Sequence, residues 1–291
     1  MRGLIGEREL VEGVPGYLQA PLVRWLTIGF RFGQDASTSV QLRLRREIYA
    51  PQANPDEQSK LILDGDDLLE AVDALLATNA YLITANHPMF EQDSQEWPEH
   101  VWDLRHRLTE AGSAWQPAKD ASGLERRVDE TVARAAEAVI ATALADAATH
   151  LRAAWAAAYG FHPDPEKAYS QAIKAAEAAV IPVTISKDGS PTLGKALKHM
   201  QDTNEQTTRW TTVLHDKNGA PASAESIIGL IKLLWEGQRD RHAGGPTTKP
   251  TTQEAAEAAV HTAIALVQWF QSGAVVKAPR TRTGAAVERD V

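Results

Sequence analysis

The sequence predicts a mainly α-helical protein, in which a C-terminal antiparallel helical bundle follows a smaller α+β N-terminal domain. Alanine, the best helix former, is abundant in runs such as residues 153–158 and 254–260. From residue 129 onward, apolar residues recur at steps of three and four, whereas the first part of the chain lacks this regularity. We therefore expect an N-terminal domain over residues 1–128, a helical bundle over 129–272 and a loose tail over 273–291.

The composition excludes several classes of protein. The 291 residues include no cysteine, which excludes disulfides, thiolate metal sites and cysteine catalysis. A formal net charge of −8 argues against a broad surface for duplex DNA or anionic membranes, but it leaves room for a small phosphate site. No stretch reads as a membrane span or a signal peptide, so we expect a soluble, cytoplasmic protein with no membrane contact.

The N-terminal domain is predicted from short, mixed signals. Residues 22–32 form an apolar segment that indicates a helix, and residues 64–78 indicate another, which Asp64 caps. Val40, Leu42 and Leu44 alternate with polar residues, which predicts a half-buried strand over 40–49. The basic face of that strand could meet nucleic acid, although a solvated face is the favoured interpretation. Residues 114–118 and 124–128 predict a hairpin.

The C-terminal domain is predicted as a series of helices. Residues 129–160 indicate one long helix, and Asp164 with Pro165 begins a second helix that ends at Ile181-Pro182. A short helix over 192–201 follows. Turns at 187–191 and 216–221 separate it from its neighbours, and Ser223 caps the next helix. The last helix begins at Thr252 or Gln253 and runs through Phe270. Short loops between such helices predict antiparallel packing.

The segment that joins the last two helices carries the strongest candidate for chemistry. Arg239, Arg241 and His242 stand within four residues and are followed by Gly244, Gly245 and a proline. A guanidinium can hold phosphate oxygens through paired hydrogen bonds, and an imidazole exchanges a proton near neutral pH. These groups suffice for metal-free cleavage of RNA by its own 2′-hydroxyl. The alternative is an ordinary helix C-terminus, where cations complement the helix dipole and glycine ends the helix.

The order of the helical segments adds a resemblance. A helix over 164–177 is followed by a short Leu-Gly-x-x-Leu helix at 193–197. An Ile- and Leu-rich helix then ends in Arg-His-x-Gly-Gly, and the last helix contains Ala-Val-His-x-Ala. This pattern resembles the abortive-infection C-terminal domain of the HEPN superfamily over roughly residues 129–272. Residues 1–128 match no family pattern.

The resemblance implies a four-helix bundle, a homodimer and a metal-independent endoribonuclease that acts in phage defence. It places His242 at the family histidine, with Arg239 and Arg241 as phosphate ligands and RNA as substrate. The family arginine usually stands further from the histidine than Arg239 does, and Gly237 and its two predecessors are not basic. The alternatives are therefore a non-catalytic dimerisation or partner-binding module, or a phage accessory or structural protein. A protein partner or antitoxin would bind the N-terminal domain.

Other polar residues are weaker candidates. His261 in the last helix and His162 before Asp164 read as ordinary structural histidines, and Glu177 and Lys174 read as solvated charges that could orient Arg239. The nine histidines form no metal-binding spacing, and the chain has neither a phosphate-binding glycine loop nor a Gly-x-Ser-x-Gly motif. We expect no metal and no cofactor.

Overall fold

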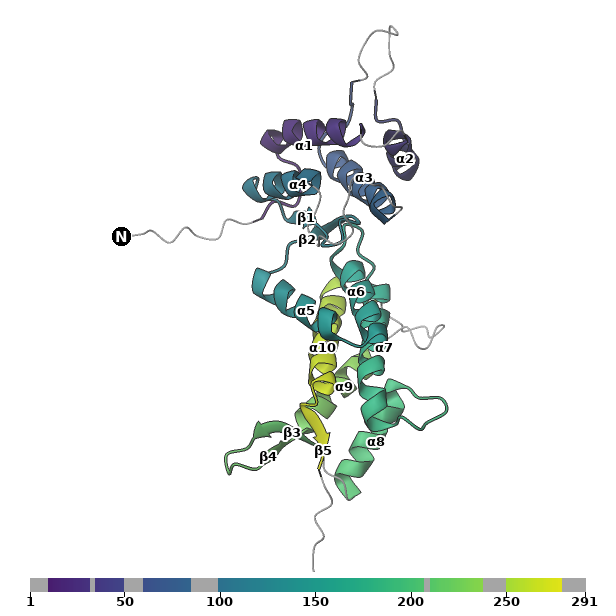
Figure 1. Cartoon of the computed structure of the whole chain (residues 1–291), viewed down its shortest axis with the longest axis vertical. Coiled ribbons are helices and arrows are strands. Elements are labelled where there is room, and N and C mark those ends of the chain that lie inside the picture. The colour runs from purple at the N-terminus through teal and green to yellow at the C-terminus, as the bar shows by residue number, and fades with distance from the viewer. Residues whose placement is uncertain are drawn as a thin grey trace, which may run out of the picture. The chain divides into compact units, whose positions relative to one another are not determined.

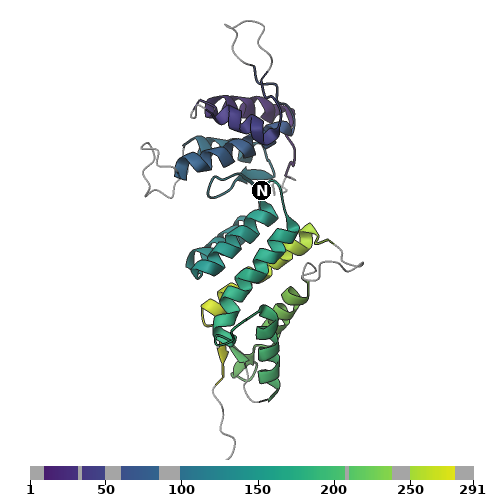
Figure 2. The same cartoon turned by 90° about the vertical axis from the view of Figure 1, so that its right-hand side faces the viewer.

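The computed structural model describes residues 10–31, 35–49, 60–84, 99–206, 210–237 and 250–278. Over these residues the chain is mainly helical, with ten helices and two small antiparallel sheets (Figures 1 and 2). The chain divides into two compact units. The N-terminal unit comprises Met1–Val128 together with Tyr159–His162, and the C-terminal unit comprises Asp129–Ala158 and Pro163–Val291.

The described residues of the N-terminal unit form four helices and one hairpin. Its elements are α1 (Gly16–Gly29), α2 (Ala36–Leu44), α3 (Asp67–Thr84), α4 (Glu99–Glu110), β1 (Trp115–Pro117) and β2 (Leu124–Arg126). Leucines from α1, α3 and α4 surround the fully buried Trp25, whose indole N–H donates to the carbonyl of His100 at 2.8 Å. The core of this unit is therefore helical, and the hairpin lies at its margin.

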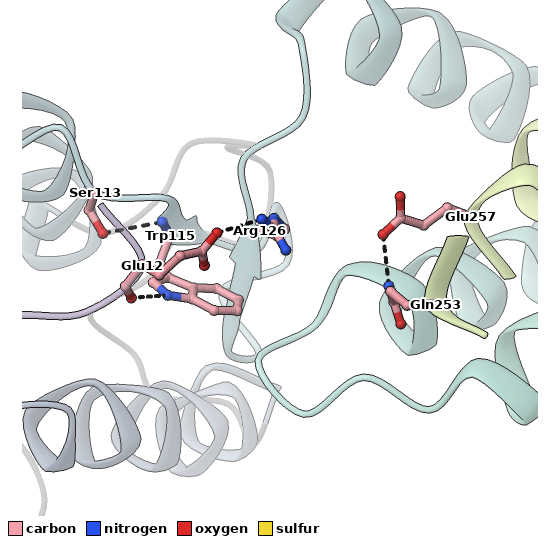
Figure 3. A network of polar contacts seen from close by, with 6 residues as sticks. All are labelled: Glu12, Ser113, Trp115, Arg126, Gln253 and Glu257. Atoms are coloured by element: carbon pink, nitrogen blue, oxygen red, sulfur yellow. Dashed lines mark hydrogen bonds and ion pairs between the residues drawn. The ribbon is translucent and has the colours of Figure 1, made fainter. Parts of the chain in front are cut away.

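The hairpin was predicted at this place, and its strands pair antiparallel with Trp115 opposite Arg126. The chain before α1 joins its edge: Val11 bridges Ser113 in parallel, and the indole of Trp115 donates to the carbonyl of Glu12 at 2.8 Å. Figure 3 shows the bond from Trp115 to Glu12 together with the ion pair between Glu12 and Arg126. The short hairpin thus gains a third segment from the start of the chain.

The strand predicted over residues 40–49 is wrong, because residues 36–44 form helix α2. Ala36, Val40 and Leu44 are spaced by four residues and lie on one helical face, and the first two are buried. Leu42, which suggested a two-residue period, is 74% exposed. Arg45 adopts a left-handed conformation with φ 53° and ends the helix. The same apolar residues fit both periods, and packing against α3 selects the helix.

The C-terminal unit contains six helices and a three-stranded sheet among its described residues. Its elements are α5 (Glu130–Thr142), α6 (Ala145–Tyr159), α7 (Pro165–Thr184), α8 (Leu193–Gln206), β3 (Trp210–His215), β4 (Pro221–Ser223), α9 (Glu225–Gly237), α10 (Gln253–Gln271) and β5 (Val275–Lys277). The long helices α7 and α10 lie side by side at the centre of this unit (Figures 1 and 2). Small buried residues on both helices, such as Ala172, Ala176, Ala259 and Ala263, allow their close approach.

The prediction that neighbouring helices of the bundle are antiparallel is wrong for α7 and α10. The backbone N–H of Thr251, just before α10, donates to Glu166 in the first turn of α7 at 2.7 Å. The two helices therefore begin at the same end and run in the same direction. Helix α9 ends near the same turn, so α9 and α10 run in opposite directions.

The single helix predicted over residues 129–160 is two helices. The backbone of Ala143 is extended, with φ −69° and ψ 152°, and it separates α5 from α6. The N–H of Leu144 donates to the side chain of Gln271 at 3.1 Å. Alanine favours helix on both sides of this point, so the break depends on a hydrogen bond from a distant part of the chain.

Several predicted helix starts are confirmed. Asp164 accepts from the N–H of Lys167 at 3.0 Å, with Pro165 as the first helical residue of α7, and Thr252 accepts from Ala255 at 3.2 Å at the start of α10. The predicted end at Ile181-Pro182 is wrong by a few residues, because α7 continues through Pro182 to Thr184. A proline this close to a helix end removes only one hydrogen bond.

The sheet of the C-terminal unit was not predicted. Strand β3 pairs antiparallel with β4 on one side and with β5 on the other, and Thr212 faces Val275. Strand β5 falls within the tail expected over residues 273–291, and Val275 is buried. The tail prediction is therefore wrong for Val275–Lys277. No helix among the described residues has the length and apolar character needed to cross a membrane.

Candidate functional site

The three residues that carry the candidate chemistry, Arg239, Arg241 and His242, lie outside the described residues. The structure describes the two ends of the segment that contains them. Helix α9 is described as far as Gly237, and the chain is described again from Pro250. We call residues 238–249 the junction. The described residues on either side of the junction contact other helices.

The end of α9 is held by α7 and α8. The hydroxyl of Tyr169 donates to the carbonyl of Leu234 at 3.0 Å in a buried contact. Gly237 lies against the same hydroxyl so closely that a Cβ at this position would collide with it. The indole of Trp235 packs on Gly194 of α8, where a Cβ would likewise collide. The last turn of α9 is therefore fixed against two other helices.

The start of α10 is held by α7 and by the end of α6. The carboxylate of Glu166 accepts from Thr251, which precedes the capping residue of α10. The side-chain amide of Gln253 donates to the carbonyl of Ala158 at 2.6 Å and to Glu257 at 2.8 Å. Figure 3 draws the Gln253–Glu257 pair. These bonds satisfy the carbonyl at the end of α6 and fix where α10 begins.

One turn of α7 thus contacts both ends of the junction. Glu166 and Tyr169 are three residues apart in this helix, and residues at that spacing lie on the same side. Sequence reasoning did not single out either residue. Glu166 reads as an acidic residue of a first helical turn, and Tyr169 reads as a core position. A polar hydroxyl within an otherwise apolar stripe was the signal that could have drawn attention to Tyr169.

The other candidate residues have structural partners. Glu177 accepts from the N–H of Leu193 at 2.9 Å and thereby holds the start of α8, and Lys174 is exposed. His261 lies with its ring edge toward Trp155 of α6, with ring centroids 6.1 Å apart. His162 belongs to the N-terminal unit, where it contacts Phe161. None of these contacts brings Glu177 or His162 to either described end of the junction.

The pKa of Glu254, in the first turn of α10, is lowered by hydrogen bonds from its own backbone N–H and from Thr252. A carboxylate favours this position because the helix dipole stabilises negative charge there. Glu254 is therefore ionised at neutral pH and suits a helix start rather than proton transfer.

Within the described ranges, no three His, Asp or Glu side chains come together in a way that could hold a metal ion. Comparisons of the chain with protein-family models, with curated proteins and with solved structures find no match.

Proposed function

We propose that this protein is a metal-independent endoribonuclease of the HEPN type, which acts in the cytoplasm as a homodimer in abortive infection or a similar phage defence. The main support for the nuclease function is the position of the candidate residues in the chain. The segment with Arg239, Arg241 and His242 joins the last two helices of a helical unit, and both of its ends are bound to one turn of α7. A segment held at both ends can present a guanidinium and an imidazole with little loss of entropy on binding substrate.

The proposed reaction uses the 2′-hydroxyl of RNA as the nucleophile. His242 accepts the proton of this hydroxyl, and the oxygen attacks the adjacent phosphorus. The bond to the 5′-oxygen of the next nucleotide breaks, and that oxygen takes a proton from an imidazolium, which the second copy of the chain supplies. The products are a 2′,3′-cyclic phosphate and a 5′-hydroxyl. Arg239 and Arg241 bind the phosphate oxygens and stabilise the charge that develops on them.

Removal of the proposed catalytic groups tests this function. We expect His242→Ala and Arg239→Ala each to reduce cleavage of single-stranded RNA in the presence of EDTA by about 10²–10³-fold. The melting temperature should stay nearly unchanged, because the side chains that hold the ends of the junction remain. Cleavage by the Arg239→Ala/His242→Ala double variant at the parent rate would disprove the mechanism.

A second candidate function is a partner-binding module without catalysis. The far half of β3 favours it, because Val213 and Leu214 are 58% and 57% exposed and lie on opposite faces of the strand. Exposed apolar residues of this kind suit a protein contact. Expression in bacteria separates the two functions: growth arrest that requires His242 indicates the nuclease, and harmless overexpression indicates the binding module.

The N-terminal unit is proposed to bind a protein partner or antitoxin rather than RNA. Acidic residues outnumber basic residues over the first 128 positions, which disfavours a phosphate backbone as ligand. Trp102 on α4 is 48% exposed, and the guanidinium of Arg105 lies 5.5 Å from the centre of its ring. Tryptophan and arginine are the residues most enriched at the energetic centres of protein interfaces.

A further inference from the structure

We propose that a groove beside the hairpin of the N-terminal unit binds an extended peptide from a protein partner, in which an acidic residue precedes a glycine. Residues 11–14 of the chain itself fill this groove in the structure, and we call them the strap. A partner peptide would displace the strap and take over its contacts. This site rests on the partner-binding role proposed above for the N-terminal unit, and it specifies the class of peptide that the unit binds.

The strap joins the hairpin through its backbone, as an added strand does. The N–H of Val11 donates to the carbonyl of Gly112 at 2.9 Å, and the carbonyl of Val11 accepts from the N–H of Ala114 at 2.8 Å. These two bonds form the parallel bridge between Val11 and Ser113. Addition of an extended segment to the edge of a sheet is a general mode of peptide recognition, because the backbone bonds form with many different side chains.

Glu12 makes the charged contact of the strap. Its backbone carbonyl accepts from the indole N–H of Trp115 at 2.8 Å, and its carboxylate forms an ion pair with the guanidinium of Arg126 (Figure 3). Trp115 and Arg126 lie opposite each other in β1 and β2, so each strand of the hairpin directs a donor at this residue. A guanidinium binds a carboxylate through charge-assisted hydrogen bonds. The groove therefore favours an acidic side chain at this position of its ligand.

The next position of the strap favours glycine. A Cβ on Gly13 would lie 2.8 Å from Oδ1 of Asp66, which is too close for ordinary packing. The same oxygen accepts from the N–H of Val14 at 3.2 Å, so a movement of Asp66 away from a side chain would disturb this bond. The contacts of the strap thus define a ligand with an acidic residue followed by glycine.

The strap buries little apolar surface. Leu10 before it and Val11 within it are 42% and 36% exposed, and the side chains of Arg126 and Glu12 are 52% and 55% exposed. Its retention therefore depends on backbone bonds and on a solvent-exposed ion pair, which contributes little to stability on its own. A tethered segment has an effective concentration on the order of 1 mM. A free peptide with the same contacts should therefore bind well only after the strap is weakened.

The test measures binding of a fluorescent peptide, Leu-Val-Glu-Gly-Val-Pro, to the full chain by fluorescence anisotropy. Two variants weaken the strap from opposite sides of the ion pair: Glu12→Lys and Arg126→Glu. Glu130→Lys is the matched control, because Glu130 is an exposed glutamate of the C-terminal unit and its substitution changes the net charge as Glu12→Lys does. A second peptide has lysine in place of glutamate, and a third has alanine in place of glycine.

We expect Glu12→Lys to bind the glutamate peptide about tenfold more tightly than the parent and Glu130→Lys do, because the strap occupies less of the groove. Arg126→Glu should prefer the lysine peptide by about tenfold, which reverses the preference of Glu12→Lys. The alanine peptide should bind Glu12→Lys about tenfold more weakly than the glutamate peptide does. Thermal unfolding checks that the variants fold as the parent does, since both side chains of the ion pair are more than half exposed.

Equal affinity of Glu12→Lys and Glu130→Lys for the glutamate peptide would overturn the proposal, because the strap would then not compete for the site. The same preference in Arg126→Glu and Glu12→Lys would also overturn it, since Arg126 would then not recognise the acidic residue. The assay contains no RNA, so its result is independent of the nuclease. Failure of the groove to bind peptide leaves the nuclease and the contact around Trp102 standing, and a parent that does not cut RNA leaves the groove standing.

Discussion

At the scale of single residues, His100 is the clearest example of a side chain whose chemistry depends on its surroundings. Its ring stacks on the buried indole of Trp25, with ring centroids 4.2 Å apart and planes 6° from parallel. Burial disfavours the charged imidazolium and lowers its pKa from 6.5 to about 4, despite the nearby carboxylate of Asp103. In the folded protein His100 is therefore neutral at physiological pH, and it serves the core of the N-terminal unit.

This shift predicts a dependence of stability on pH. The unfolded chain protonates His100 near pH 6.5, whereas the folded chain resists protonation until about pH 4. The free energy of unfolding should therefore be highest above pH 6.5 and fall by about 2–3 kcal/mol as pH falls to 4 through this group. His100→Gln, which cannot titrate, should show a flatter profile in urea unfolding between pH 7 and 4.5. Identical slopes for parent and variant would contradict the assignment.

The pKa of the Asp73 carboxyl is likewise shifted in opposite directions by burial and by its polar neighbours. Burial raises its pKa, while the hydrogen bond from the N–H of Leu124, at 2.7 Å, and the charges of His162 and Arg43 lower it. Gly123 lies against this carboxylate, and a Cβ there would come within 2.7 Å of its oxygen. Asp73 thus links α3 to the hairpin, and its environment indicates a structural role.

At the scale of secondary-structure elements, hydrogen bonds at the helix ends show which helix boundaries the local sequence encodes. Asp129, Asp164 and Thr252 each accept backbone N–H groups at a helix start, and the sequence predicted the last two of these starts. At the end of α5, by contrast, the N–H of Leu144 bonds Gln271, which comes from α10. These three helix starts are encoded locally, whereas the end of α5 is accompanied by a tertiary contact.

Gly237, in the last described turn of α9, yields a prediction with an unusual sign. Alanine normally stabilises a helix relative to glycine by about 1 kcal/mol. Gly237→Ala should instead lower the free energy of unfolding by about 1–3 kcal/mol, because its Cβ would collide with the hydroxyl of Tyr169. In the Tyr169→Phe background the collision is relieved, so the same substitution should cost much less or stabilise. Urea unfolding of the four proteins measures this coupling. Additive effects would show that the hydroxyl does not exclude the side chain.

At the scale of the whole molecule, the N-terminal unit is discontinuous in sequence. Residues Tyr159–His162 follow α6 and yet belong to this unit. Gly160 bridges Glu125, the N–H of Phe161 donates to the carbonyl of Leu124 at 3.0 Å, and the ring of Phe161 contacts Trp115. A fragment that ends at residue 128 would therefore lack the residues of this unit that contact its hairpin.

Phe161 provides the test of this arrangement. Phe161→Ala should lower the stability of the N-terminal unit by about 2–3 kcal/mol, somewhat less than for a fully buried phenylalanine. Hydrogen exchange resolved by peptides should show reduced protection in α1 and α3 and parent protection in α7 and α10. Phe270→Ala, whose side chain is buried in the C-terminal unit, should give the opposite pattern. Loss of protection in α7 and α10 with Phe161→Ala would contradict the division.

Three features of the fold were predictable from the sequence alone, because neighbouring residues encode them. They are the predominance of helix, the caps at Asp164 and Thr252, and the hairpin around residues 119–123. The candidate residues of the junction also come from sequence alone, since Arg239, Arg241 and His242 are adjacent in the chain. Local periodicity, capping and turn chemistry need no knowledge of distant partners.

Only the tertiary structure decided the rest, because it depends on residues far apart in the chain. The apolar spacing of residues 36–44 fits a strand or a helix until α3 provides the surface that favours one of them. The break after α5, the pairing of β3 with β5 and the common direction of α7 and α10 each require a partner dozens of residues away. A single sequence shows which groups can form such bonds, and packing selects the bonds that are formed.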